Sequence, residues 1–156
     1  MTSTRGIDPR GPRFGAAITG VLLLVVIGLS LGGLIVPALI IFIAQTVLFA
    51  WGAFAGITRH PYGLLFKKLV RPRLKPPTEL EDPTPPTFAQ GVGFVITLIG
   101  VILTVIGLPL ALPIAAALAF IAAFLNSVFG YCLGCQIYLL LVRAGVLGRH
   151  RSPAAA

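Results

Sequence analysis

Two long stretches without charge dominate the hydrophobic pattern of this chain. Residues 14–58 and 83–142 contain no Lys, Arg, Asp or Glu and consist mainly of Leu, Ile, Val, Ala, Gly and Phe. A membrane-spanning helix needs about 20 predominantly apolar residues. Each stretch is therefore long enough for two spans, which we expect at 14–31, 34–56 and 88–107 and from residue 113 onward.

Spans joined by short turns make helical hairpins, and the two hairpins resemble each other. Phe14 and Phe88 open them, and Gly56 and Gly130 follow at the same spacing. A Leu-Val-Arg sequence ends each half, at 69–71 and at 141–143. We predict an all-α membrane protein with four transmembrane helices as two pseudo-repeated hairpins, with short interfacial helical segments on the cytoplasmic side.

The placement of positive charge predicts the orientation of these hairpins. The formal net charge is +8, and charged residues make up only 10% of the chain, against roughly 25% in a soluble domain. The Lys and Arg residues fall near the two chain ends and between the hairpins, whereas both hairpin turns are uncharged. Basic residues mark the cytoplasmic side. We therefore expect a multi-pass protein of the cell (plasma) membrane with both termini in the cytoplasm, and no nucleic acid partner.

Composition divides the chain into five parts. The residues at both chain ends are polar and basic, and the segment between the hairpins is rich in proline, which excludes a regular helix there. The expected parts are a cytoplasmic tail (1–13), the first hairpin with an interfacial segment (14–71), a Pro-rich cytoplasmic linker (72–87), the second hairpin with the CxxC segment (88–145) and a second cytoplasmic tail (146–156).

The segment 58–71 alternates apolar residues with Lys67, Lys68 and Arg71. This pattern predicts a short helix in the headgroup region of the membrane, with its cations near anionic lipid phosphates. The pseudo-repeat puts Arg59 and His60 in places equivalent to the cysteine segment of the second half.

Two amide side chains lie within the expected spans. Gln45 is near the middle of the second span and Asn126 is in the fourth. A buried amide in lipid needs a partner on another helix, so we interpret both as structural links between helices, with a substrate contact as the alternative. Asn126 belongs to a stripe of small residues that matches one on the third span. The two stripes predict a close seam between the third and fourth helices.

The only two cysteines, Cys132 and Cys135, form a CxxC motif near the end of the last apolar stretch. Positions three apart share one face of a helix, which brings Gln136 and Tyr138 beside them. A helix that starts just after Gly130 would aim free amide groups at Cys132 and lower the pKa of its thiol. In an unbroken helix those amides are already bonded, and the sequence leaves both arrangements open.

An expected location in the reducing cytoplasm argues against a permanent structural disulfide. We interpret the pair first as a reversible dithiol, with two inert buried side chains, or a metal site completed by His60 or a second subunit, as alternatives. His60 is a candidate proton acceptor for a thiol, and Arg59, Gln136 and Tyr138 are candidate supporting residues. We predict no cofactor and assign no metal site, and the sequence leaves enzymatic activity open.

Several motifs together resemble one family of membrane proteins. They are residues 10–14 (RGPRF), 70–74 (VRPRL), 76–82 (PPTELED), 86–90 (PTFAQ), 131–135 (YCLGC) and 138–140 (YLL). They are similar to small actinobacterial membrane proteins catalogued as domain of unknown function 4395, and the resemblance covers nearly the whole chain. It implies no established activity. Members tend to be encoded near thioredoxin-like and sulfurtransferase proteins, which implies thiol or sulfur chemistry and a partner of one of those kinds.

Three functions follow from these features. The first is thiol redox or sulfur handling, in which one cysteine attacks a partner disulfide or persulfide and the other resolves the intermediate. The second is a transporter subunit for a small solute such as a sulfur anion, although no ionisable residue lies within the spans. The third is a non-catalytic anchor for a soluble partner, and a homo-oligomer is compatible with each. Quinone-coupled thiol oxidases share a four-helix architecture but use more than one cysteine pair outside the cytoplasm, which disfavours that class.

Overall fold

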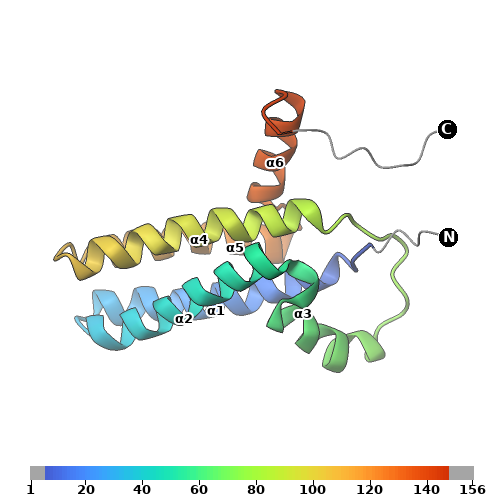
Figure 1. Ribbon diagram of the computed structural model, residues 1–156. Helices are drawn as coiled ribbons and strands as arrows, with labels where there is room; N and C mark the ends of the chain where they lie inside the picture. Colours follow the sequence, from blue (N-terminus) through green and yellow to red (C-terminus); the bar gives the residue numbers. More distant parts are fainter. Residues whose placement is uncertain (1–5, 148–156) are drawn as a thin grey trace.

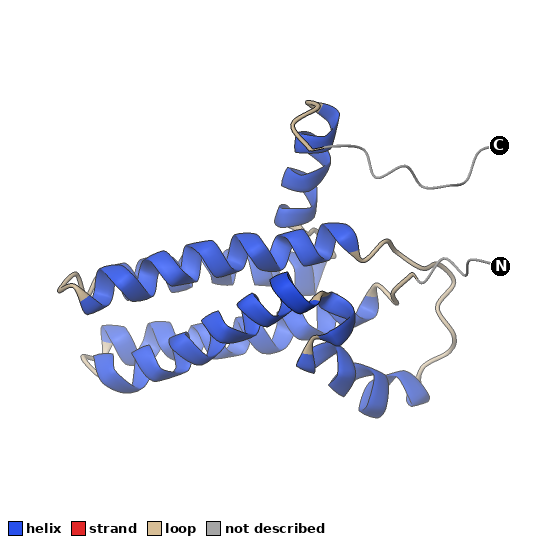
Figure 2. Ribbon diagram, in the orientation of Figure 1, coloured by secondary structure: helices blue, strands red, loops and turns tan. Residues whose placement is uncertain are grey.

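The computed structural model describes residues 6–147 of the chain, and these are folded almost wholly into helices (Figure 1, Figure 2). Four long helices run side by side: α1 (Arg10–Leu31), α2 (Ile35–Ala55), α4 (Thr84–Val105) and α5 (Ala111–Phe129). Two shorter helices, α3 (Pro61–Leu65) and α6 (Leu133–Arg143), follow the first and second hairpin. Within the described range, β pairing is limited to one bridge between Ile7 and Glu81.

All four long helices are long and apolar enough to cross a membrane. Large apolar side chains on their outer faces stay exposed, among them Val21 (63%), Ile40 (64%) and Phe54 (80%). Helices that are apolar on every face are typical of membrane spans. The prediction of an all-α membrane protein with four spans is confirmed.

Both hairpins start earlier than expected, and for the same reason. An Asp-Pro pair precedes each hairpin, and the aspartate caps the first turn. Asp8 Oδ1 accepts the Arg10 amide hydrogen (3.0 Å), and Asp82 Oδ1 accepts the Thr84 amide hydrogen (2.8 Å). Proline is tolerated in a first helical turn because its missing N–H has no partner there in any case. The helices therefore begin at Arg10 and Thr84, not at Phe14 and Phe88.

The two halves pack around each other as equivalent units. Ile7 and Glu81 hold equivalent positions, and they pair with each other through two backbone hydrogen bonds (2.8 and 2.9 Å). The most extensive helix contacts are α1 with α5 and α2 with α4, and each of these pairs is the repeat equivalent of the other. Each long helix therefore packs more extensively against a helix of the other hairpin than against the second helix of its own hairpin.

Charged residues gather at one end of the bundle. Figure 1 shows the two hairpin turns together at one end, and the N-terminal segment, α3 and the linker at the other. Every Lys, Arg, Asp and Glu of the described residues lies in 6–13, 57–83 or α6. We call these segments, with the residues 130–132 that lead into α6, the basic end.

The opposite half of the bundle is filled by a hydrophobic core. Leu23, Phe42, Leu112 and Ala116 are fully buried at its centre. A Cβ atom placed on Gly100 of α4 would lie only 2.5 Å from Ala115 Cβ of α5. The predicted close seam between α4 and α5 is therefore present where Gly100 meets Ala115, since only glycine lets the two helices come so near.

The segments outside the spans differ from expectation in two places. Residues 6–9 pair with the linker, whereas the tail was expected at 1–13. The single short helix expected at 58–71 is a succession of turns: a 3₁₀ turn (Ile57–Arg59), α3, a π turn (Phe66–Val70) and a second 3₁₀ turn (Arg71–Arg73). Most of the predicted C-terminal tail, with Arg149 and Arg151, lies outside the described residues.

Candidate functional site

The cysteine segment forms a helix of its own, because α5 ends at Gly130. Gly130 adopts a left-handed conformation (φ 67°), which glycine reaches without strain. The amides of Gly130 and Tyr131 donate to the carbonyl groups of Asn126 and Leu125, both at 3.1 Å, so the last carbonyls of α5 are satisfied. The chain then turns and α6 leaves the bundle, crossing the direction of the long helices (Figure 1).

Cys132 is the residue that caps the start of α6. Its Sγ accepts a hydrogen bond from the Cys135 amide (3.3 Å), and its carbonyl accepts one from the Gln136 amide (3.0 Å). Cys132 and Cys135 are joined by a disulfide, so the pair is in its oxidised form where we expected no permanent disulfide. Both cysteines are half-buried, which disfavours the interpretation as two inert core residues.

α6 is pressed tightly against α4 at the position between the two cysteines. A Cβ atom on Gly134 would lie 2.5 Å from Ala89 Cβ and 2.6 Å from Ala89 Cα. One turn later, the Tyr138 ring packs on Phe88 with centroids 5.5 Å apart. Tyr138 is therefore a packing residue that fixes α6 on the bundle. Gln136 lies beside the pair, with its side chain exposed.

The disulfide lies in the wall of a cavity at the basic end. The cavity has a volume of about 610 Å³, and its wall includes Cys132, Cys135 and Gln136. The long helices contribute Phe49, Ile96, Leu118, Ala119, Ala122 and Ala123 as apolar lining. Polar groups in the wall come from several elements, namely Arg13, Thr19, His60, Tyr62, Gln90 and Asn126. Ligand sites are typically cavities of about 300–1,000 Å³ with this mixture of apolar walls and a few polar groups.

His60 caps α3 in the way that Cys132 caps α6. Its Nδ1 accepts the Tyr62 amide hydrogen (3.2 Å), which requires the proton to be on Nε2. Nε2–H then donates to the Leu48 carbonyl (3.2 Å). Burial lowers the pKa of His60, so the ring is neutral at pH 7. With both nitrogens bonded to backbone groups, His60 acts as a structural cap here.

A chain of hydrogen bonds runs from the cavity into the bundle. The Tyr62 hydroxyl donates to Gln45 Oε1 (3.2 Å), and Gln45 Nε2 donates to Thr19 Oγ1 (3.3 Å). Burial raises the pKa of Tyr62, so its hydroxyl remains a donor. Gln45 is almost fully buried (2% exposed), and it links α2 to α1 as a structural amide should.

The other predicted residues are more dispersed. Asn126 is half-buried and lines the cavity, so it does not lie wholly within the helix seam. Arg59 is exposed and does not line the cavity, unlike its neighbour His60. Among residues 6–147, no group of three or more His, Cys, Asp or Glu side chains could hold a metal ion.

Arg13 is the main residue of the site that the sequence did not single out. Its guanidinium donates to the carbonyl groups of Ser127 and Val128 at the end of α5, both at 3.4 Å. A cation there complements the negative end of the helix dipole. Its position as the last charge before the first apolar stretch was visible in the sequence, but its contact with α5 depends on the crossing of the two halves.

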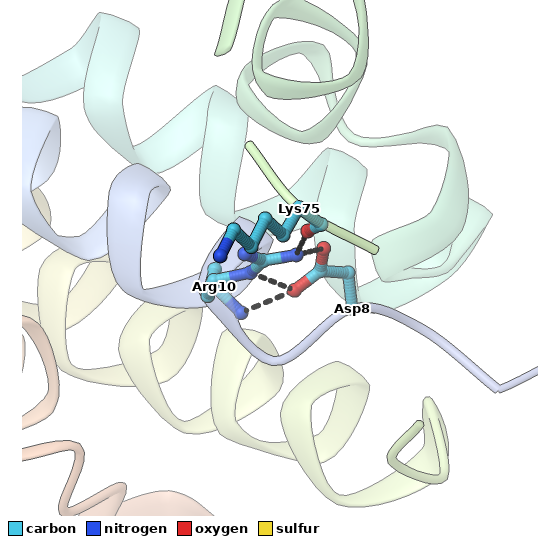
Figure 3. Close-up of polar contacts among 3 residues, drawn as sticks. All are labelled: Asp8, Arg10 and Lys75. Carbon is cyan, nitrogen blue, oxygen red and sulfur yellow. Dashed lines mark hydrogen bonds and ion pairs between the residues drawn. The ribbon is translucent and has the colours of Figure 1, made fainter. Parts of the chain in front are cut away.

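The N-terminal segment and the linker are tied together beside the cavity. Figure 3 shows the Arg10 guanidinium between the Asp8 carboxylate and the Lys75 carbonyl oxygen. It donates to Asp8 at 2.9 and 2.7 Å and to Lys75 at 3.0 Å. The hydrogen bond from Arg10 lowers the pKa of Asp8. Ile7, Asp8, Glu81 and Asp82 also line the cavity, so this clamp borders its mouth.

Comparison with known proteins places the chain in a family without assigning an activity. No curated protein and no solved structure matches it. Residues 7–143 match the family described as domain of unknown function DUF4395, from the bridge residue Ile7 to the last residue of α6. Since this match spans both hairpins, both short helices and the cysteine pair, the chain belongs to the DUF4395 family.

Proposed function

We propose that Cys132 and Cys135 form a reversible dithiol–disulfide couple that exchanges electrons or sulfur with a soluble thiol protein. The single observation that carries the proposal is the hydrogen bond from the Cys135 amide to Cys132 Sγ at the start of α6. Free amides at a helix N-terminus stabilise a thiolate, and thiols so placed in CxxC motifs have lowered pKa values. Cys132 is therefore the exchanging cysteine and Cys135 the resolving one.

The expected orientation of the protein determines whether the disulfide is permanent or transient. With the basic end on the cytoplasmic side, as the distribution of Lys and Arg favours, the pair faces a reducing compartment. Disulfides there are usually transient and catalytic or redox-sensing. The oxidised pair is then one half of a cycle. Both cysteines are half-buried residues, so a partner at the membrane surface can reach the pair.

The exchange conserves atoms and electrons. A thiolate of a thioredoxin-like partner attacks Cys132 Sγ, the Cys132–Cys135 bond breaks, and Cys135 leaves as a thiolate. The second thiolate of the partner then attacks the partner's sulfur atom in the mixed disulfide and releases Cys132 as a thiolate. The partner gains a disulfide, and this protein gains two thiols after protonation. In the reverse direction, the reduced pair attacks a partner disulfide or persulfide.

Trapping of the mixed disulfide tests this proposal. In a Cys135→Ser variant, Cys132 has no resolving partner and should accumulate a mixed disulfide with a thioredoxin-like protein added as its disulfide. A Cys132→Ser variant is the matched control and should accumulate at least tenfold less. Equal trapping by both variants, or by neither, contradicts the proposal.

The hydrophobic core argues against the transporter alternative. The cavity is lined by residues at and next to the basic end, and the opposite half of the bundle is closed by fully buried residues such as Leu23, Phe42 and Leu112. A passage across the membrane would have to separate these side chains. A redox role requires access from one end alone.

A further inference from the structure

We propose that the cavity at the basic end binds a lipid-soluble quinone, which accepts electrons from the reduced Cys132–Cys135 pair. This inference rests on the proposed function, because it names the oxidant that would restore the disulfide. It starts from a different observation, however: an apolar cavity within a membrane bundle that has a redox-capable sulfur pair in its wall.

The lining of the cavity fits a flat apolar ring with a few oxygen atoms. The four long helices contribute apolar side chains such as Phe49, Ile96 and Leu118, while the Gln90 and Asn126 amides add polar groups from α4 and α5. Within the described part of the chain, neither of these amides has a side-chain hydrogen bond. Amide N–H groups suit the carbonyl oxygens of a quinone. The Tyr62 hydroxyl and Thr19 hydroxyl lie in the same wall.

Charge is excluded from most of this lining. Apart from Arg13 in the first turn of α1, the charged residues that border the cavity come from segments outside the long helices, namely Asp8, Lys67, Arg71, Glu81 and Asp82. Arg13 itself is directed to the end of α5. A neutral, membrane-soluble ligand therefore fits the inner part, and a charged solute fits only the mouth.

The chemistry of the pair narrows the ligand class further. Formation of a disulfide from two thiols releases two electrons and two protons, which a quinone takes up together. The two S–H bonds break, one S–S bond forms, and the two quinone carbonyl oxygens become hydroxyl groups. The presence of a single cysteine pair on the expected cytoplasmic side disfavoured a quinone-coupled thiol oxidase at the level of sequence. One pair is nevertheless sufficient for this reaction, because a soluble cytoplasmic partner supplies the second dithiol. An acyl chain of a phospholipid could fill the same volume but could not accept electrons.

Substitution of a cavity alanine separates the quinone site from the cysteine chemistry. Ala122 is a half-buried residue of the wall, and Ala44 is an exposed residue on the outer face of α2. Ala122→Phe should fill the cavity, whereas Ala44→Phe adds the same ring on the lipid side. The probe is a short-chain ubiquinone, whose ring carbons are fully substituted and resist direct alkylation by thiols.

The rate of quinol formation and the binding of ubiquinone complete the test, with two controls on the variants. Anaerobic mixing of reduced protein in micelles with the ubiquinone should give quinol, at a rate at least tenfold lower for Ala122→Phe than for wild type or Ala44→Phe. Maleimide reactivity and thermal unfolding of the variants show that the fold and the access to the thiols are retained. Calorimetric binding of the ubiquinone to the Cys132→Ser, Cys135→Ser double variant should survive, since this variant keeps the cavity.

The outcomes distinguish this inference from the proposed function. Equal quinol formation by folded Ala122→Phe and wild type overturns the quinone site, as does ubiquinone that neither binds the double variant nor oxidises the wild-type pair. Co-purification of phospholipid alone, undisplaced by ubiquinone, also overturns it. In each of these cases, trapping of a mixed disulfide at Cys132 would still support the redox couple, and absence of trapping would remove that couple independently.

Discussion

The two halves of the protein use the same contacts to dock different short helices. In the first half, Phe66 packs on Phe14, with ring centroids 5.8 Å apart. In the second half, Tyr138 packs on Phe88 at 5.5 Å. Both pairs join the start of the first helix of a hairpin to the short segment that follows that hairpin. The repeat has therefore retained the docking of the short segment as well as the hairpin itself.

The difference between the halves lies in the residue that caps each short helix. His60 precedes the first Leu-Val-Arg sequence by the same spacing at which Cys132 precedes the second, so the two caps are equivalent. Each accepts a backbone N–H from the first turn of its helix. In the first half the capping side chain is an imidazole with both nitrogens bonded to backbone groups. In the second half the capping atom is the Cys132 sulfur. Under the proposed function, exchange of the acceptor atom makes this capping position a reactive one.

Residues near the two caps also differ between the halves, with polar side chains in the first half and small residues in the second. The first half has Thr19, Gln45 and Tyr62 in a hydrogen-bonded chain. At the equivalent positions the second half has Gly93, Ala119 and Gly134, all of which line the cavity. One half is thereby stiffened by polar contacts, while the other brings backbone and small side chains close together around the disulfide.

Among the substitutions that test the comparison of the two halves, a bulky residue at position 134 should lower stability most. Gly134→Leu has no space beside the Ala89 backbone, so α6 must leave α4, with a loss of about 3 kcal/mol from the folded state. The control is Gly28→Leu, because a Cβ on Gly28 meets nothing within 4 Å. Thermal unfolding in micelles and hydrogen exchange of α6 measure the effect. Equal stability of the two variants would refute the tight docking of α6.

Loss of the His60 cap should have the next largest effect. His60→Ala removes the acceptor for the Tyr62 amide and the donor to Leu48, and we expect a loss of about 1–2 kcal/mol in the stability of α3. His60→Asn restores a capping oxygen and should recover part of this. Hydrogen exchange of residues 61–70 reports the change. If His60→Ala exchanges like wild type, His60 does not hold α3.

The same cap predicts a dependence on pH. The pKa of His60 is lower in the folded protein than its ordinary value of 6.5, so the unfolded segment binds a proton more readily. Stability from the neutral ring is thus complete above about pH 6.5 and declines as the pH falls below that value. Exchange of residues 61–70, taken relative to His60→Asn at each pH, should rise as the pH falls below about 6.5. A constant ratio would contradict the assignment.

The buried amide should contribute less than the His60 cap. Gln45→Leu removes the interhelical bond to Thr19 and the acceptor for Tyr62, and hydrogen bonds between membrane helices are worth about 0.6 kcal/mol on average. Tyr62→Phe removes only the second of these bonds and should have a smaller effect. Comparison of unfolding midpoints in micelles checks this order. A larger loss for Tyr62→Phe would show that the chain depends on Tyr62 and not on Gln45.

The clamp between the N-terminal segment and the linker should give the smallest effect on stability. Asp8→Asn weakens the ion pair with Arg10 and frees the linker near Lys75, which raises the rate of proteolysis there without changing the unfolding of the bundle. Because the folded pKa of Asp8 is lowered, wild type should show the same release only as the pH falls below about 3.8. Unchanged cleavage of Asp8→Asn at pH 7 would contradict the clamp.

Much of the architecture could be predicted from the sequence because it depends on local hydrophobicity. Uninterrupted apolar stretches specify the spans, and the repeated Phe, Gly and Leu-Val-Arg signals specify two equivalent hairpins. The early helix starts were missed because the residues before Phe14 were interpreted as a polar tail and the prolines before Phe88 as helix breakers. Asp-Pro at both hairpins is nevertheless a capping signal that repeats at the same spacing.

The candidate site was only partly predictable, because it depends on how the two halves cross. The spacing of Cys132 and Cys135 identified the pair, and Gly130 suggested where α6 starts. Proximity of Arg13 to the end of α5, and of Ala89 to Gly134, arises from contacts far apart in the sequence. No local pattern encodes such contacts, so the cavity and its lining required the three-dimensional structure.

The redox state and sidedness of the cysteine pair in intact cells test the central claim most directly. Cells are quenched with acid, alkylated before and after reduction, and the Cys132–Cys135 peptide is quantified by mass spectrometry, with a non-permeant maleimide applied to intact and to inside-out membranes. The account predicts a mixture of reduced and oxidised pair that shifts with added oxidant or reductant, and labelling only from the cytoplasmic face. A pair that stays oxidised under every condition, or is labelled from outside intact cells, contradicts it.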